Sequence, residues 1–181
     1  MESISDQVRQ FLFAGGGTGV FALLDGASVP GLRDKLHQVR PEFECLYRGD
    51  LEPDLAEVAP YLVRLERKSD FTGWVLTEGW GKHWGLFACA ESDLHTMRQH
   101  FRRFLVVHDQ AGKPMYFRYY DPRVLRTYLP TCNGRELTEM FGPVESFVLE
   151  GEEAKVLLRF RVASGALAAT KQLLEPDKKH T

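Results

Sequence analysis

The residues of this chain that are best suited to chemistry lie in one short run, FRYYDPRVL at positions 117–125. Arg118 and Arg123 flank two tyrosines and an Asp-Pro step. Guanidinium and aromatic groups often anchor protein interfaces, and a guanidinium also pairs well with carboxylates. The run contains no evident nucleophile or metal ligand. This corner of the chain therefore predicts binding rather than a reaction.

The same run predicts the local structure that would present these side chains. Alternating aromatic and charged residues over 115–120 favour a half-buried strand. Asp121 can cap the helix expected at 122–129, and Pro122 suits its first position, where the missing N–H costs nothing. We predict that Asp121 and Pro122 fix the turn. The residues predicted to contact a partner at this corner are Arg118, Tyr120, Arg123 and Tyr128.

A second candidate surface lies on the helix expected to begin after a Ser92 cap. Its apolar side carries Leu94, Met97, Phe101 and Leu105. Arg98 and Arg102 lie away from that side, four residues apart, so they project together. An ordinary solvated helix face explains them equally well. We predict that Arg98 and Arg102 join the first corner in binding an acidic or mixed segment of a partner.

An alternative reading is a small cytosolic α/β enzyme or a nucleotide-binding protein that uses Asp25 and the run Gly15–Gly19. Strand ends in open α/β sheets bind ligands, and Asp25 follows a buried apolar run. However, a phosphate loop ends in Gly-Lys-Ser or Gly-Lys-Thr and enters a helix, whereas Val20 and a strand follow here. Asp25-Gly26 is also an ordinary turn. The sequence leaves this alternative open behind the binding role.

No catalytic residue, metal site or cofactor is predicted. His95 and His100 are five residues apart on one expected helix, whereas a helical metal pair requires three or four. The cysteines are three in number and far apart, which favours free thiols in a reduced compartment. Glu2 and Asp6 stand where a secretory signal would be basic. We therefore expect a cytoplasmic protein.

Composition narrows the classes of partner. The chain has 181 residues, of which 44% are hydrophobic, so one domain over 1–181 with a real core is expected. The net charge is −2, from 23 basic and 25 acidic residues, which argues against a nucleic-acid partner. Because no run of 18 apolar residues occurs, no membrane partner is expected either. Protein partners fit this balance best.

Hydrophobic periodicity predicts an α/β fold with a mixed β-sheet flanked by helices, a C-terminal antiparallel hairpin and a short helix. Strands are expected at 20–24, 43–47, 61–65 and 85–90, with helices between them. The hairpin joins 147–149 to 156–162. A helix is expected over 166–174, followed by a frayed charged tip at 177–180.

In the order of these segments the chain resembles the bacterial effector adaptors, or chaperones, of type VI secretion, catalogued as domain of unknown function 4123. The similarity covers about residues 19–150, and its most specific part is the corner RYYDPRVL at 118–125. The other matching segments are FALLDGA at 21–27, PYLV at 60–63, WGL at 84–86, MRQHFRRFL at 97–105 and FGP at 141–143.

The resemblance implies a non-catalytic adaptor. Such proteins are encoded beside a toxic effector, bind that secreted effector protein and help load it onto the VgrG spike protein, while they remain in the producing cell. On this interpretation, the arginines and tyrosines at 118–128 and the arginines at 98 and 102 supply the residue types that a modest, partly polar interface requires.

Overall fold

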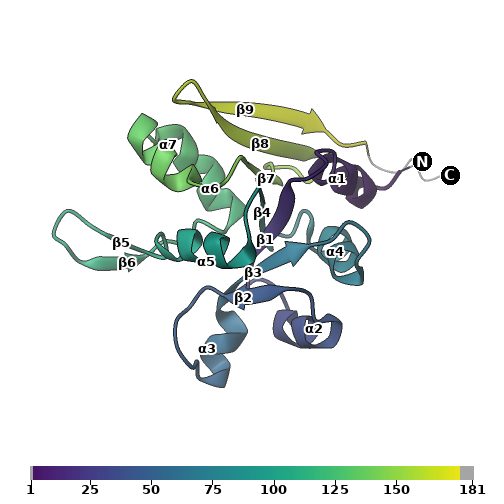
Figure 1. Ribbon diagram of the computed structural model, residues 1–181, viewed down its shortest axis with the longest axis horizontal. Helices are drawn as coiled ribbons and strands as arrows, with labels where there is room; N and C mark the ends of the chain where they lie inside the picture. The colour runs from purple at the N-terminus through teal and green to yellow at the C-terminus, as the bar shows by residue number, and fades with distance from the viewer. Residues whose placement is uncertain (1, 176–181) are drawn as a thin grey trace.

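The fold is built around one twisted sheet (Figure 1). The computed structural model describes residues 2–175, so the predicted tip at 177–180 lies outside the described residues. Within them, the main sheet has seven strands in the order β2-β3-β1-β4-β7-β8-β9. These strands are β1 (Gly19–Asp25), β2 (Phe43–Cys45), β3 (Pro60–Leu65), β4 (Gly85–Ala90), β7 (Ser146–Glu150), β8 (Val156–Ala163) and β9 (Ala166–Leu173). A separate hairpin pairs β5 (Val106–His108) with β6 (Pro114–Tyr116).

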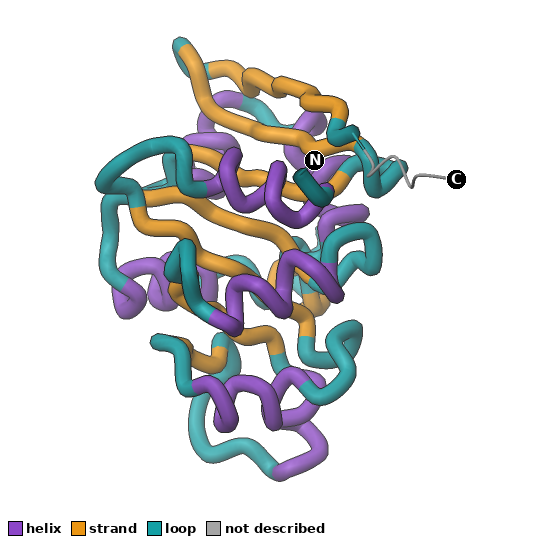
Figure 2. Tube along the Cα trace, turned by 90° about the vertical axis from the view of Figure 1, so that its right-hand side faces the viewer, coloured by secondary structure: helices purple, strands orange, loops and turns teal. Residues whose placement is uncertain are grey.

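Helices cover both faces of the sheet, which gives three layers (Figures 1 and 2). One face is covered by α1 (Ile4–Leu12), α2 (Leu32–Val39) and α4 (Asp70–Trp74), the last continued by a π-helical turn at Val75–Gly79. The other face is covered by α5 (Leu94–Arg102), α6 (Pro122–Tyr128) and α7 (Gly134–Phe141). A short helix, α3 (Pro53–Val58), lies near the edge strand β2. A 3-10 turn at Leu129–Thr131 follows α6.

The predicted α/β class with a C-terminal hairpin is confirmed, but the sheet is antiparallel throughout rather than mixed. Every neighbouring pair among the described strands runs in opposite directions. The physical reason lies in the crossovers. The connection through α2 places β2 two positions away from β1, and β3 then runs between them in the opposite direction. In the same way, the connection through α4 places β4 two positions away from β3, with β1 antiparallel between them.

The predicted helix over 166–174 is wrong, because this segment forms the edge strand β9. Ser164 and Gly165 make a two-residue connection, and both have a positive φ, of 51° and 76°. Turns of this geometry match the twist of an antiparallel pair and return the chain directly beside the preceding strand. The pairing of β8 with β9 then outweighs the helix propensity of the alanines in this segment.

Two further expectations need local correction. The strand predicted over 115–120 ends at Tyr116, because the chain turns where the Asp121 N–H donates to the Arg118 carbonyl oxygen at 3.0 Å. Helix α5 is capped by Asp93 rather than Ser92, since the Asp93 carboxylate accepts the Thr96 N–H at 2.7 Å. The strand was predicted four residues too long, and the helix cap was predicted one residue too early.

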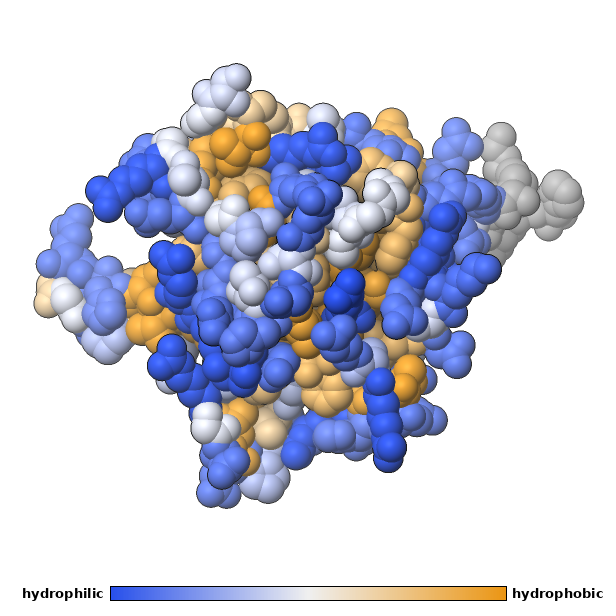
Figure 3. All heavy atoms as spheres, viewed as in Figure 1, coloured by the Kyte–Doolittle hydropathy of each residue, from blue (hydrophilic) through white to orange (hydrophobic). Residues whose placement is uncertain are grey.

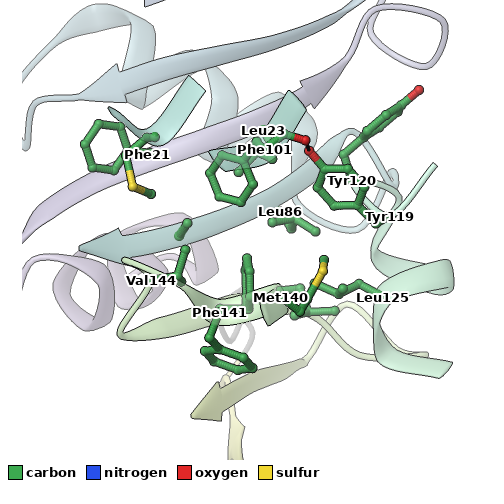
Figure 4. Close-up of a cluster of buried hydrophobic side chains, with 14 of the residues drawn as sticks. Phe21, Leu23, Leu86, Phe101, Tyr119, Tyr120, Leu125, Met140, Phe141 and Val144 are labelled. Atoms are coloured by element: carbon green, nitrogen blue, oxygen red, sulfur yellow. Dashed lines mark hydrogen bonds between the residues drawn. The ribbon is translucent and has the colours of Figure 1, made fainter. Parts of the chain in front are cut away.

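The core on the α5–α7 face contains the largest group of buried rings (Figure 4). Phe21 and Leu23 of β1 meet Phe101 of α5 there, and Tyr119 packs into the same cluster. The Tyr119 hydroxyl donates to the Phe101 carbonyl oxygen at 2.7 Å, whereas the Tyr120 hydroxyl points away from the cluster. This core therefore holds the irregular segment 117–121 against the sheet.

Strand β4 approaches β1 closely at the end of the sheet where β1 finishes. A Cβ atom at Gly85 would overlap the carbonyl oxygen of Leu23, so only glycine fits at this position. The approach lets the Asp25 N–H donate to the Trp84 carbonyl oxygen at 2.9 Å. Asp25 is thereby fixed at the sheet end.

No helix among residues 2–175 is both long and apolar enough to cross a membrane.

Phe101→Ala tests whether this core carries the fold. Phe101 is fully buried between the rings of Tyr119 and Phe147. We expect the free energy of unfolding to fall by about 3–5 kcal/mol, from lost burial and the cavity left behind. Urea unfolding measures this loss, and Phe101→Leu should lose clearly less. Equal stability of Phe101→Ala and the parent protein would contradict the packing described.

Candidate functional site

The first element of the site is the carboxylate of Asp25, which ends β1 and is only 1% exposed. It forms an ion pair with the Arg118 guanidinium. It also accepts the Ser28 hydroxyl at 2.7 Å and the Ala27 N–H at 3.1 Å. The turn predicted at Asp25-Gly26 is present, and it carries a fully engaged buried carboxylate.

The second element is Asp121, which occupies the N-cap position of α6 that was expected for it, with Pro122 in the first turn. Its carboxylate accepts the Arg123 N–H at 2.9 Å and holds the Arg123 guanidinium through Nε at 3.0 Å and Nη2 at 2.7 Å. Burial alone would raise the pKa of Asp121, but these bonds from Arg123 outweigh it and lower the pKa below its usual value.

The third element is Glu150, which sequence reasoning missed. It ends β7, is 3% exposed, accepts the N–H groups of Gly81 and His83, and lies against Nδ1 of the His83 ring. Helix α6 is tied to the same strand end, because Arg126 donates to the Gly151 carbonyl oxygen at 3.0 Å. The signal that could have found Glu150 is an acid followed by glycine after an apolar run, the pattern already noted at Asp25-Gly26.

The topology brings these three carboxylates to the same end of the sheet, where β1 and β7 finish. Strands β1 and β7 both pair antiparallel with β4, so they run in the same direction and end on the same side. Asp121 joins them there through α6, and its bonds, together with Glu150 and Asp25, raise the pKa of Arg123. We call Asp25, Asp121, Glu150, Arg118 and Arg123 the carboxylate–arginine cluster. The two arginine side chains of this cluster remain 48% and 53% exposed.

The tyrosines of the corner differ in their exposure. Tyr120 is buried beside Tyr47, and burial raises the pKa of Tyr120 well above its usual value. Tyr128 is half-buried and packs edge-on against Phe117, with ring centroids 4.8 Å apart. Burial raises the pKa of Tyr128 to about 12. Both phenols are therefore protonated at neutral pH, and Tyr128 keeps more exposed surface than Tyr120 does.

Arg98 and Arg102 lie on one side of α5 as predicted, but the structure engages them with the backbone of the neighbouring edge strand. Arg98 donates to the Cys45 carbonyl oxygen at 3.1 Å and pairs with Glu44 at 3.2 Å. Arg102 donates to the carbonyl oxygens of Leu46, at 2.9 Å, and Tyr47. Because β2 ends at Cys45, the carbonyl groups from Cys45 onward need hydrogen-bond donors from outside the sheet, and the two arginines supply them. Partner binding by Arg98 and Arg102 stays a prediction.

Tyr47 links the two predicted surfaces. Its carbonyl oxygen accepts Arg102, and its phenol lies next to that of Tyr120 in the corner. Sequence reasoning did not select Tyr47, because its neighbours in space are 55 and 73 residues away along the chain. The structure thus places Arg118, Tyr120 and Arg123 around one sheet end and connects them through Tyr47 to the arginines of α5.

The alternative site based on Asp25 and Gly15–Gly19 is not assembled. Gly19 begins β1 and Asp25 ends it, so the glycine run and the carboxylate lie at opposite ends of a strand about 20 Å long. The Asp25 carboxylate is also occupied by Arg118 and Ser28. Across residues 2–175, no group of three or more His, Cys, Asp or Glu side chains is arranged to hold a metal ion.

Comparison with known proteins gives one match. The family model described as Domain of unknown function (DUF4123) matches residues 20–139. The chain belongs to this family. No curated protein and no solved structure matches the chain. The DUF4123 match starts with β1 and ends inside α7, so it includes the pairs Asp25–Arg118 and Asp121–Arg123, whereas Glu150 lies beyond it.

Asp121→Asn tests the electrostatics of the corner. Because the folded-state pKa of Asp121 is lowered, its ionised form stabilises the fold above about pH 4, and this contribution disappears as pH falls through the lowered pKa. Asparagine can still cap α6 but does not titrate. We expect the free energy of unfolding of the variant to decline less between about pH 4 and pH 2. An acid decline identical to that of the parent protein, measured by urea unfolding, would contradict the role given to Asp121.

Proposed function

We propose that this chain is a non-catalytic adaptor that binds a type VI secretion effector and helps load it onto the VgrG spike. The observation that carries the proposal is the pair of guanidinium groups of Arg118 and Arg123. Each is about half exposed, and each forms an ion pair with a buried carboxylate. Membership of the DUF4123 family and the resemblance to effector adaptors give this geometry its biological context.

The arrangement suits capture of a protein partner for an energetic reason. Binding costs conformational entropy for every long side chain that becomes fixed, and arginine is among the most costly. Here Asp25 and Asp121 already fix the two guanidinium groups before any partner arrives. Their exposed N–H groups can then donate hydrogen bonds to carboxylate or carbonyl oxygens of the effector at a reduced entropic cost.

The same contacts favour binding over a reaction. A carboxylate that acts as a general base must reach its substrate, whereas Asp25 and Asp121 are buried beneath the arginines that they hold. The phenol of Tyr120 is kept neutral by its raised pKa. Capture that depends on exposed ionic groups is also easily reversed, as an adaptor requires if it is to release its cargo.

Alanine at both Arg118 and Arg123 tests the site. We expect affinity for the effector encoded beside this chain to fall at least about 30-fold, because two anchoring arginines are lost. Isothermal titration calorimetry with the purified effector measures the change. Arg135→Ala is the matched control, since Arg135 is 88% exposed on α7 and should bind as the parent protein does.

A further variant guards against simple unfolding. Arg118→Ala leaves Asp25 buried without its ionic partner, which itself destabilises the protein. Arg118→Lys keeps a positive charge for Asp25 but loses the planar fork of N–H donors. We expect Arg118→Lys to keep its melting temperature within a few degrees of the parent and still bind the effector more weakly. Undiminished effector binding by the double alanine variant and by Arg118→Lys would contradict the site.

A ligand screen addresses the enzyme alternative. A nucleotide or metal ion present at 100 times its dissociation constant adds about 2.7 kcal/mol to the free energy of unfolding. For a chain of this size such a gain raises the melting temperature by about 5–10 °C. We expect no rise with ATP, GTP, Mg²⁺ or Zn²⁺ in a thermal-shift assay. A clear rise with any of them would favour the enzyme alternative over the adaptor.

A further inference from the structure

A groove of about 570 Å³ opens between α3, the end of α5 and the base of the β5–β6 hairpin. Its lining is mostly apolar or aromatic and includes Leu51, Leu55, Val106 and Tyr116. We call it the hairpin groove. Tyr47 also lines it, so the groove is continuous with the corner that holds Tyr120 and Arg118.

The groove gathers apolar surface that a free protein normally keeps covered. Tyr116 is 80% exposed, Leu55 45% and Val106 42%, and these are three of the six exposed large apolar side chains among the described residues. Val106 and Tyr116 stand directly opposite each other in the β5–β6 ladder, so they share one face of the hairpin. In Figure 3, apolar surface appears at the base of the projecting hairpin and again over α3. Apolar surface gathered in this way marks an interaction site.

The charge of the groove has one sign. Its charged lining residues are Arg48 and Arg102, and no carboxylate lines it. Asp50, Glu52 and Asp54 lie on the same stretch of chain but outside the lining. Burial lowers the pKa of Arg102, and the nearby cations Arg98 and Arg48 lower it further. An occupant with acidic side chains would relieve this repulsion.

The hairpin itself has few means of holding its position. It projects from the body of the molecule (Figure 1), and each of its strands has three residues. An isolated two-stranded hairpin is marginally stable in water. One backbone bond, from the Phe117 N–H to the Leu105 carbonyl oxygen at 2.9 Å, fastens its base. A partner seated in the groove would bury Tyr116 and Val106 and so fix the hairpin against α3.

We propose that the hairpin groove binds an acidic, apolar segment of the cargo protein. Large apolar side chains of that segment would pack on Leu51, Leu55 and Val106 under Tyr116, while its carboxylates would face Arg48 at the rim. The inference rests on the proposed adaptor function and adds to it the place and chemistry of the cargo contact. The arginine pair of the corner would then contact the same cargo beyond Tyr47.

Two single substitutions test the groove against the purified effector. Tyr116→Asp puts a negative charge among the apolar anchors, and Arg48→Glu reverses the charge of the rim. We expect each to weaken effector binding at least tenfold without a change in the melting temperature, because both side chains are exposed. Leu173→Asp is the matched control, since Leu173 is 73% exposed on β9, at the opposite edge of the sheet from β2, and should bind as the parent does.

The outcomes separate this inference from the proposed function. Loss of binding in the Arg118→Ala and Arg123→Ala double variant, with full binding by Tyr116→Asp and Arg48→Glu, would overturn the groove and leave the adaptor role intact. A concentration-dependent dimer that Tyr116→Asp disrupts would assign the groove to a second copy of this chain and overturn the cargo proposal.

If the parent protein binds no effector, the adaptor role fails and a defined probe decides the groove. The probe is a fluorescein-labelled synthetic peptide of leucine and glutamate in amphipathic helical spacing, compared with the same peptide carrying lysine for glutamate. Saturable binding of the glutamate peptide that Tyr116→Asp abolishes, measured by fluorescence anisotropy, supports the groove. Equal binding of both peptides, or of neither, overturns it.

Discussion

The ion pair between Asp25 and Arg118 joins the end of the central strand to a segment 93 residues later in the chain. Residues 117–121 form neither helix nor strand, so they depend on such contacts for their position: Phe117 is tied to Leu105, Tyr119 to Phe101, and Arg118 to Asp25. Removing one member of a buried ion pair lowers the free energy of unfolding by about 3–5 kcal/mol. The loss is smaller here because the Arg118 side chain is 48% exposed. With this segment in place, Asp121 stands where it can begin α6 and hold Arg123.

The same constraint explains why the exposed arginines are arranged for contact rather than for chemistry. Buried carboxylates at one end of the sheet act as fixed anchors for guanidinium groups that are about half exposed, so the groups offered to a partner there are cations although the whole chain has a charge of −2. Arg98 and Arg102 serve the neighbouring surface differently, because they hold the backbone after β2 in the position that shapes one wall of the hairpin groove. Together these features describe one continuous surface, half ionic and half apolar, which suits a protein partner of mixed character.

Local chemistry in the sequence was sufficient for the parts of the fold that depend on neighbouring residues. The Asp-Pro step places the start of α6, and the apolar run before Asp25 gives β1. Contacts between distant segments could not be predicted in this way. Arg98 meets a carbonyl group 53 residues earlier, Glu150 meets His83, and the hairpin groove combines residues 46–55 with Val106 and Tyr116. Strand β9 was missed for a different reason: the alanines favour a helix, while the turn at Ser164 and Gly165 and the partner β8 decide the outcome.

The central claim is that cargo is held on the surface that runs from the carboxylate–arginine cluster through Tyr47 to the hairpin groove. Hydrogen–deuterium exchange of the free protein and of its complex with the effector measures this most directly. The account predicts slower exchange in the complex at residues 46–56, 103–108 and 114–123, with β8 and β9 unchanged. Protection confined to β8 and β9, with the hairpin and the corner exchanging as in the free protein, would contradict it.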